Sequence, residues 1–311
     1  MRTFALSICV VAACGNSSSP PDHPVDAPNT KLDGGITTGN AYDQDGPTPY
    51  TVETHQLNAG GSAFNVTLYM PSTSGPHPIV SISAGTSQTA AAYAPHAKRL
   101  ASYGIAAIIA DDPGVLTNTS DVLPNSIYVV DTYLPSLGAA VDLTRVGLSG
   151  HSRGGAVSLL TAQHLPGKVK AWFGLDPVDN EFGQAPREYA RTKMSMMTIP
   201  TAFIGGSVVG NCAPVADSYQ LLYPKAAPPS VLIVGIGAEH TQFESQDACS
   251  ACSICTPAGT ADATVVLAYT VRYMTAFFAR ELNADTSVGA AFEGAGASED
   301  IAASRVTIMS K

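Results

Sequence analysis

The stretch Arg145-Val-Gly-Leu-Ser-Gly-His-Ser-Arg-Gly-Gly155 decides how the rest of the chain is interpreted. Its first five residues read as a short buried strand, and Gly154-Gly-Ala156 opens a segment with a helical pattern. Between them, Gly150-His-Ser-Arg-Gly154 is the one G-x-S-x-G motif in the sequence. A serine between a strand and a helix, flanked by glycines that let the backbones approach, occupies a sharp and exposed turn. The sequence therefore predicts Ser152 as a nucleophile, with a plain glycine-rich strand–helix turn as the alternative.

Short apolar runs alternate with helix-length segments on both sides of this turn. Continuous apolar runs are typical of strands that are buried on both faces of a parallel sheet. Strands are expected at 64–70, 78–83, 105–110, 146–149, 169–175, 201–204 and 231–235, and helices at 89–103, 126–141, 154–165, 214–223 and 263–282. This order predicts an α/β fold of three layers with a mostly parallel central sheet.

A serine nucleophile needs a base, which in this arrangement comes late in the chain. His240 follows the strand expected at 231–235 directly, and the sequence predicts it as the base. His151 lies inside the turn and is expected to point away from Ser152. The other histidines lie on early elements, at a helix end or near the N-terminus, and no role at the site is expected for them: His23, His55, His77, His96 and His164.

The third member of such a site is a buried carboxylate between the serine and the histidine in chain order. The loop after the strand expected at 201–204 is its usual place, but residues 205–212 contain no carboxylate. Asp176, in Asp176-Pro-Val-Asp179, ends the preceding strand, where functional groups of open α/β sheets gather. We therefore expect Asp176 to be the acid, with Asp179 and Asp217 as alternatives and a simple Asp-Pro turn as the structural reading.

Two backbone N–H groups are needed to bind the oxyanion that forms when a serine attacks a carbonyl. Arg153, directly after the nucleophile, offers one of them. The loop Ala84-Gly-Thr-Ser87 follows the strand expected at 78–83, and Thr86 is expected to offer the other.

With these residues in place, the segment from about Tyr50 to Asn283 resembles the α/β-hydrolase superfamily. Leu148-Ser-Gly-His-Ser-Arg-Gly-Gly155 followed by Gly174-Leu-Asp-Pro-Val-Asp179 is similar to the chlorophyllase branch, as is Cys212-Ala-Pro214. The segments around 84–103 and Ser152 are similar to bacterial polyester hydrolases and cutinase-like esterases. The resemblance implies ester hydrolysis through an acyl-enzyme and an acid at Asp176 or Asp179.

The expected function is thus that of a serine esterase with a carboxylic ester as substrate and no cofactor or metal. Two alternatives remain: a lipase or phospholipase of the platelet-activating-factor acetylhydrolase type, and an inactive hydrolase fold that serves as a binding lipoprotein. The composition excludes further classes of protein. With 45% hydrophobic residues in 311, the chain can bury a full core, and a formal net charge of −9 argues against a nucleic-acid partner.

The N-terminal residues are typical of an exported protein. Residues 1–13 read as a signal peptide. Because Val11-Ala-Ala-Cys14 resembles a lipobox, Cys14 is a candidate for lipidation. A plain secretory signal is the alternative. Residues 14–46 read as a flexible tether rich in Pro, Ser and Asp. The catalytic domain is expected at 47–283, followed by a tail at 284–311 that has no assigned role and ends in a short strand expected at 305–309. Membrane contact is expected only through the lipid anchor, in the bacterial cell envelope or, without it, in secreted form.

Of four further cysteines, three lie in one loop after His240 and Cys212 lies before it. An even number of cysteines in an exported chain predicts two disulfides among Cys212, Cys249, Cys252 and Cys255. One of them is expected to tie Cys212 to residues 249–255. A metal or iron–sulfur site is the alternative, because Cys249-x-x-Cys252-x-x-Cys255 has the spacing of ligands.

Overall fold

A computed structural model of the chain describes residues 42–61, 63–112, 114, 118–180, 188–249, 252–286, 292 and 295–311. The expected signal peptide, Cys14 and most of the expected tether lie outside the described residues. Within the described ranges, no helix is long and apolar enough to cross a membrane.

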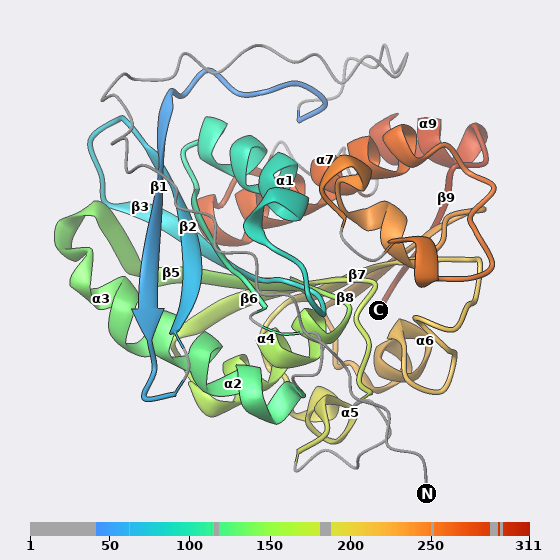
Figure 1. Cartoon of the computed structure of the whole chain (residues 1–311). Helices are drawn as coiled ribbons and strands as arrows, with labels where there is room; N and C mark the ends of the chain where they lie inside the picture. Colours follow the sequence, from blue (N-terminus) through green and yellow to red (C-terminus); the bar gives the residue numbers. More distant parts are fainter. Residues whose placement is uncertain are drawn as a thin grey trace, which may run out of the picture. The chain divides into compact units, whose positions relative to one another are not determined.

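A sheet of nine strands forms the centre of the described structure (Figure 1). In spatial order the strands are β1 (Tyr50–Asn58), β2 (Ala63–Pro71), β4 (Ala106–Ala110), β3 (His77–Ser83), β5 (Val141–His151), β6 (Val169–Leu175), β7 (Thr201–Gly206), β8 (Ser230–Gly235) and β9 (Val306–Ser310). The six strands from β4 to β8 pair in parallel, whereas β1, β2 and β9 pair antiparallel. The prediction of an α/β fold with a mostly parallel sheet is confirmed.

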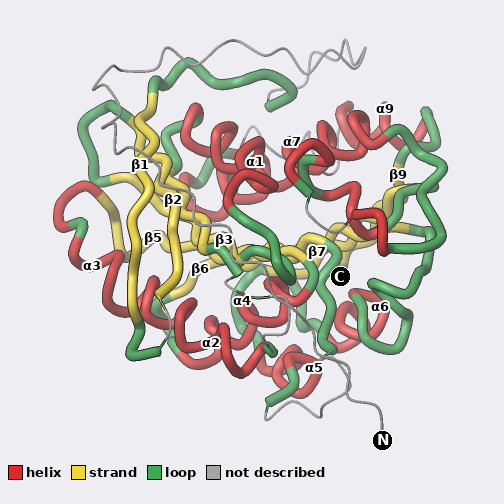
Figure 2. The backbone as a smooth tube through the Cα atoms, in the orientation of Figure 1, coloured by secondary structure: helices red, strands yellow, loops and turns green. Residues whose placement is uncertain are grey.

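Helices cover both faces of this sheet, as Figure 2 shows. On one face lie α1 (Ala90–Ser102), α7 (Ala263–Asn283) and α9 (Ala295–Ala302); on the other lie α2 (Thr119–Tyr128), α3 (Leu134–Ser136), α4 (Arg153–His164), α5 (Ala190–Lys193) and α6 (Tyr219–Leu222). Successive residues of a strand point to opposite faces. In β4, Ala107 and Ile109 accordingly join the core beneath α1 and α7, whereas Ala106 and Ile108 join the core beneath α2 and α4. This alternation explains why the strands read as uninterrupted apolar runs.

Several elements differ from the sequence prediction. The helix expected at 126–141 begins at Thr119, where Asn118 and Asp121 form a capping box, and strand β5 already begins at Val141. The helix expected at 214–223 is reduced to α6. Strand β1 was not among the expected strands.

The two ends of the described domain also pack more closely than expected. Tyr42, expected at the end of a flexible tether, is buried against the ring of Tyr103. The tail expected at 284–311 supplies α9 and the edge strand β9, which pairs with β8. Buried Arg272 of α7 binds Asp43 from one end and Asp300 from the other, so an ion-pair cluster ties both ends to the core.

The order of the strands determines where a site can form. The chain leaves β3 for β4 on one side and reaches β5 on the other side, so the connections diverge between β3 and β5. In open parallel sheets such a switch point, at the carboxyl ends of the strands, is where ligands bind. Ser152 follows β5, Asp176 follows β6, and residues 84–87 follow β3, so these predicted site residues gather at this edge.

Candidate active site

Ser152 occupies a strained turn between β5 and α4. Its φ is 54° and its ψ −129°, outside the regions that non-glycine residues usually adopt. The turn is tight because glycines flank it: a Cβ on Gly150 would lie 2.1 Å from the carbonyl oxygen of Gly154, and one on Gly154 would lie 2.2 Å from that of Ser83. Hydrogen bonds from Ser152 N–H to the Leu175 carbonyl and from Val178 N–H to the Ser152 carbonyl hold the strained residue in place.

The structure brings Ser152, His240 and Asp176 together in one line of hydrogen bonds. The Oγ of Ser152 lies 2.9 Å from Nε2 of His240, and Nδ1 of His240 lies 2.8 Å from Oδ2 of Asp176. Because a carboxylate can only accept, Nδ1 carries the proton and Nε2 is left to accept from the serine. The histidine and the aspartate are buried, whereas Ser152 is partly exposed. This is the geometry in which a histidine can take a proton from a serine hydroxyl.

Asp176 reaches His240 because the neighbouring strand leaves room for its carboxylate. A Cβ on Gly205 of β7 would lie 2.7 Å from Oδ1 of Asp176 and 2.2 Å from the ring of Tyr219. The space that a side chain at position 205 would need is therefore filled by the carboxylate from β6. Gly205 thus leaves room for both the carboxylate of Asp176 and the ring of Tyr219.

The two alternative acids are engaged elsewhere. Asp179 accepts hydrogen bonds from the N–H groups of Ala190 and Arg191 and from the Arg191 guanidinium, which also binds Asp217 at 2.9 Å. Asp179 and Asp217 thus fix the start of α5 and do not contact His240.

The loop expected to carry an oxyanion donor lies beside Ser152. A Cβ on Gly85 would lie 3.4 Å from Cβ of Ser152, which places the neighbouring Thr86, half-buried in the same turn, close to the serine. Arg153, the other expected donor through its N–H, has a buried side chain that forms an ion pair with Asp112. This pair joins the start of α4 to the loop after β4.

The charges around His240 favour its protonated form. Burial alone would lower the pKa of His240, but the hydrogen bond and charge of Asp176 raise it, and the charges of Glu244 and Glu239 raise it further. Overall the pKa of His240 lies above its ordinary value of 6.5.

Sequence reasoning missed three buried side chains behind His240. His151, expected to have no part in the site, stacks on His240 with ring centroids 4.6 Å apart. Tyr93 of α1 lies 3.0 Å from Nδ1 of His151, and Glu244 lies 3.7 Å from the same nitrogen. Burial raises the pKa of Glu244 to about 7. Strand alternation is the signal that could have found His151, since it shares the α1–α7 face of β5 with Ser149, which contacts Met274.

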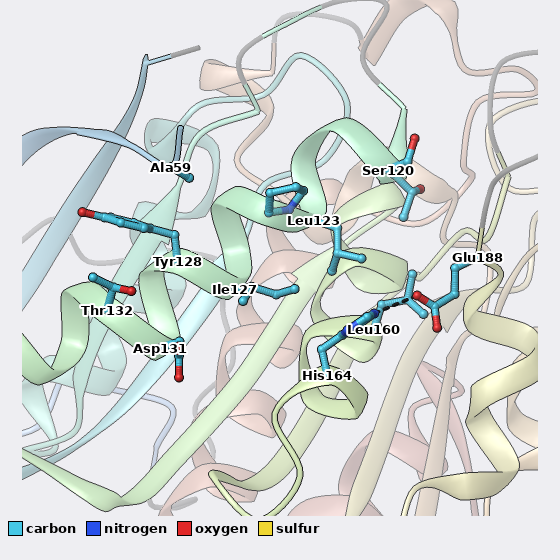
Figure 3. A pocket seen from close by; sticks show the side chains of 12 residues that line it. Ala59, Ser120, Leu123, Ile127, Tyr128, Asp131, Thr132, Leu160, His164 and Glu188 are labelled. Carbon is cyan, nitrogen blue, oxygen red and sulfur yellow. Dashed lines mark hydrogen bonds and ion pairs between the residues drawn. The ribbon is translucent and has the colours of Figure 1, made fainter. Parts of the chain in front are cut away.

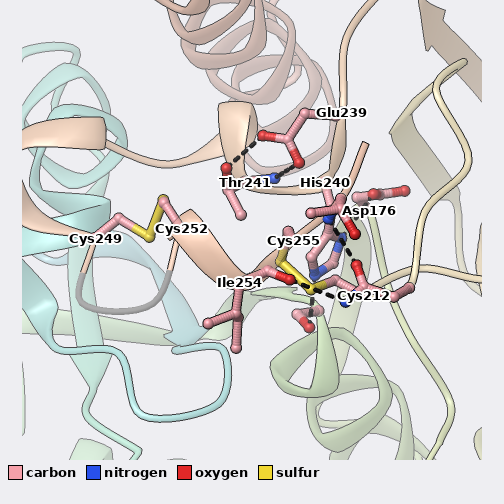
Figure 4. Close-up of a disulfide and its surroundings, with 12 residues drawn as sticks. Asp176, Cys212, Glu239, His240, Thr241, Cys249, Cys252, Ile254 and Cys255 are labelled. Carbon is pink, nitrogen blue, oxygen red and sulfur yellow. Dashed lines mark hydrogen bonds and ion pairs between the residues drawn. A yellow bond between two sulfur atoms is a disulfide. The ribbon is translucent and has the colours of Figure 1, made fainter. Parts of the chain in front are cut away.

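Both predicted disulfides are present, and Figure 4 shows them near the His240 loop. Cys212 pairs with Cys255, which confirms the link from Cys212 to the later loop, and Cys249 pairs with Cys252. The two sulfurs of the second bridge and Glu244 are the one group of potential metal ligands among the described residues. Because sulfurs in a disulfide are not thiolates, the structure does not favour the alternative of a metal or iron–sulfur site.

Loss of the Cys212–Cys255 bridge is expected to destabilise the domain. The bridge closes 43 residues that contain β8 and His240, and loop-closure entropy for that length corresponds to about 4 kcal/mol. We expect the Cys212→Ser/Cys255→Ser variant to lose about that much free energy of unfolding in a urea titration. The Cys249→Ser/Cys252→Ser variant is the matched control, since its bridge spans three residues and its loss should cost only about 2 kcal/mol. Equal losses in the two variants would contradict this account.

A cavity of about 510 Å³ lies between α2 and the C-terminal half of α4 (Figure 3). Leu123 and Ile127 of α2 and Leu160 of α4 line it, as do His164 and Glu188, which lie 2.7 Å apart. His164 ends the helix that Ser152 begins, so the two are about 18 Å apart along its axis. Ser152, His240 and Asp176 are not among the residues that line the cavity.

No protein-family model matches this sequence, and no curated protein matches it either.

Proposed function

We propose that this chain is a serine hydrolase of the α/β-hydrolase superfamily that cleaves carboxylic esters. The observation that carries the proposal is the line of hydrogen bonds from Ser152 through His240 to Asp176, at 2.9 and 2.8 Å. The strained position of Ser152 between a strand and a helix supports it, because this turn exposes a nucleophile at the carboxyl edge of a sheet.

In the proposed reaction, Ser152 attacks the ester carbonyl while His240 takes its proton. Asp176 holds the ring of His240 in the required tautomer and stabilises the imidazolium that forms. The N–H groups of Arg153 and Thr86 bind the developing oxyanion. His240 then gives the proton to the leaving alcohol, and a water activated by the same histidine releases the acid and regenerates the serine.

The resemblance to chlorophyllases and to cutinase-like polyester hydrolases supports esters as the substrate class, and the disulfides are compatible with an exported enzyme. Within the proposal, the protein works outside the cytoplasm, secreted or held by a lipid at Cys14.

A chain-length panel of p-nitrophenyl esters tests the proposal. We expect the wild-type protein to hydrolyse these esters with saturation kinetics, and an organophosphate ester to block it by modifying Ser152, as peptide mass mapping would show. Activity confined to long-chain or phospholipid substrates would favour a lipase or phospholipase instead. A wild-type protein that neither turns over esters nor reacts with the organophosphate would favour the inactive binding protein.

The midpoint of the acid limb of the pH–activity profile is expected to lie above pH 6.5. His240 must be neutral to accept the proton of Ser152, and Asp176 raises its pKa despite burial. Activity should therefore fall as the pH drops through this raised pKa. A profile of kcat/KM between pH 5 and 9 measures it, and Glu244→Gln should move the midpoint to lower pH because one of the charges that raise the pKa is gone. A wild-type midpoint below 6.5 would contradict the expected effect of Asp176.

A further inference from the structure

An unbroken chain of hydrogen bonds connects the loop after β3 to the backbone of His240. The N–H of Gly85 lies 3.0 Å from the hydroxyl oxygen of Tyr93, and the same oxygen lies 3.0 Å from Nδ1 of His151. On the other side of that ring, Nε2 of His151 lies 2.9 Å from the carbonyl oxygen of His240. Tyr93, His151 and His240 are all buried, and their contacts join residues 85, 93, 151 and 240, which are far apart in the sequence.

The donors and acceptors at the two ends of these hydrogen bonds give them a direction. The carbonyl of His240 can only accept, so Nε2 of His151 carries a hydrogen. Burial keeps the pKa of His151 well below its usual range, so the ring is neutral and its Nδ1 has no hydrogen. In the proposed chain Tyr93 donates its hydroxyl proton to Nδ1, which lies 3.0 Å away, and Glu244, 3.7 Å from Nδ1, is the competing acceptor for that proton. The backbone N–H of Gly85 can only donate, and the oxygen of Tyr93 accepts from it.

The two ends of this chain of hydrogen bonds lie in two different loops, and the proposed reaction depends on the position of one loop relative to the other. Gly85 precedes Thr86, a proposed oxyanion donor, and His240 is the proposed base. The ring of His151 is also stacked on that of His240, so it restrains both the backbone and the side chain of the base.

We propose that Tyr93 and His151 are positioning residues that hold the oxyanion loop and the base loop in register through this single directed chain of hydrogen bonds, an inference that rests on the proposed esterase function. Neither side chain contacts Ser152 Oγ through a hydrogen bond; they act through Gly85 and His240.

The smallest substitution that interrupts this chain of hydrogen bonds is Tyr93→Phe, which keeps the ring and removes the hydroxyl. It leaves the Gly85 N–H and the His151 Nδ1 without their partner, and a small displacement of catalytic groups lowers the rate of the chemical step. We expect kcat for p-nitrophenyl butyrate to fall about tenfold and KM to stay within about twofold, because the groups being positioned act in the transition state. Tyr273→Phe is the matched control, since it removes another buried hydroxyl, one that donates to Asp300. It should keep kcat within about twofold of the wild type.

Replacements of His151 separate positioning from packing. His151→Phe keeps an aromatic ring against His240 but cannot donate to its carbonyl, and we expect kcat to fall about a hundredfold, as misplacement of a catalytic group does. His151→Gln offers an amide N–H at the place of Nε2, and it should recover at least half of that loss on a logarithmic scale. Equal activity of the Phe and Gln variants, or a Tyr93→Phe variant that matches the wild type, would overturn the proposal.

A readout that does not depend on activity tests the same chain. In ¹⁵N-labelled protein, NMR should find His151 neutral with its hydrogen on Nε2, and Tyr93→Phe should shift the Nδ1 resonance. A hydrogen on Nδ1 would overturn the inference even in an active enzyme. Conversely, a wild-type protein without esterase activity but with the expected tautomer would reject the proposed function and retain the hydrogen-bond chain.

Discussion

Replacement of Ser152 by alanine is expected to lower kcat for ester hydrolysis by about 10⁶, the cost that loss of the nucleophile has in a serine protease with the same arrangement of side chains. The proposed acyl-enzyme forms on this hydroxyl, whose oxygen lies 2.9 Å from Nε2 of His240. Initial rates with p-nitrophenyl butyrate measure the effect. Reaction with an organophosphate should disappear with it.

Ser149→Ala is the control for this variant. Ser149 lies three residues earlier on β5, is fully buried and donates a hydrogen bond to the carbonyl of Phe173. Its loss should cost stability of about 1 kcal/mol while leaving kcat within a few-fold. If Ser152→Ala keeps wild-type activity, then neither the turn nor its serine carries the reaction.

The second large effect is expected for Asp176→Asn, with kcat lower by about 10⁴. An asparagine fits the same space beside Gly205, but its amide can donate a hydrogen to Nδ1 of His240. The hydrogen of the ring would then move to Nε2, the nitrogen that has to accept from Ser152. Steady-state kinetics at a fixed pH above the acid limb measure the change.

Asp179→Asn is the informative comparison, because the same chemical change is made three residues away along Asp176-Pro-Val-Asp179. Asp179 accepts from Arg191 and the start of α5, so its replacement should lower the melting temperature and leave kcat within a few-fold. A crippled Asp179→Asn beside an active Asp176→Asn would reverse the assignment of the acid.

Much of the fold could be predicted because it depends on local patterns. Strands β3, β6 and β8 appear as apolar runs within two residues of their observed bounds, and the serine turn marks the join of β5 and α4. The boundary of α2 was missed because its start is marked by the capping side chains of Asn118 and Asp121 and because Pro124 lies inside it. The sequence could indicate β9 as a strand but not its partner in the sheet. Its pairing with β8 joins residues about 75 positions apart, which no local pattern encodes.

In the candidate site, too, some residues could be predicted from local patterns, whereas others depend on contacts between distant elements. Ser152, His240 and Asp176 could be proposed because each lies within a few residues of the end of a strand, and parallel strands end at one edge. The choice of Asp176 over Asp179 depends on the space at Gly205 and on the binding of Arg191, which are contacts between distant elements. The arrangement of Tyr93, His151 and Glu244 was missed for the same reason. A polar residue at the end of a strand has no sequence signal for the partner that it meets across the sheet.

Placement of the acid on β6 has a consequence for protein engineering. In the proposed mechanism the segment 207–211 supplies no reacting group, although it lies against the loop that carries the base: Val208 N–H bonds the Ala238 carbonyl, and Gly237 N–H bonds Ser207. Cys212 closes the segment with a covalent anchor. Insertions or randomised residues between the end of β7 and Cys212 therefore alter the surroundings of the reaction centre without touching its three side chains. This segment is the natural site for a library that selects for new ester preferences.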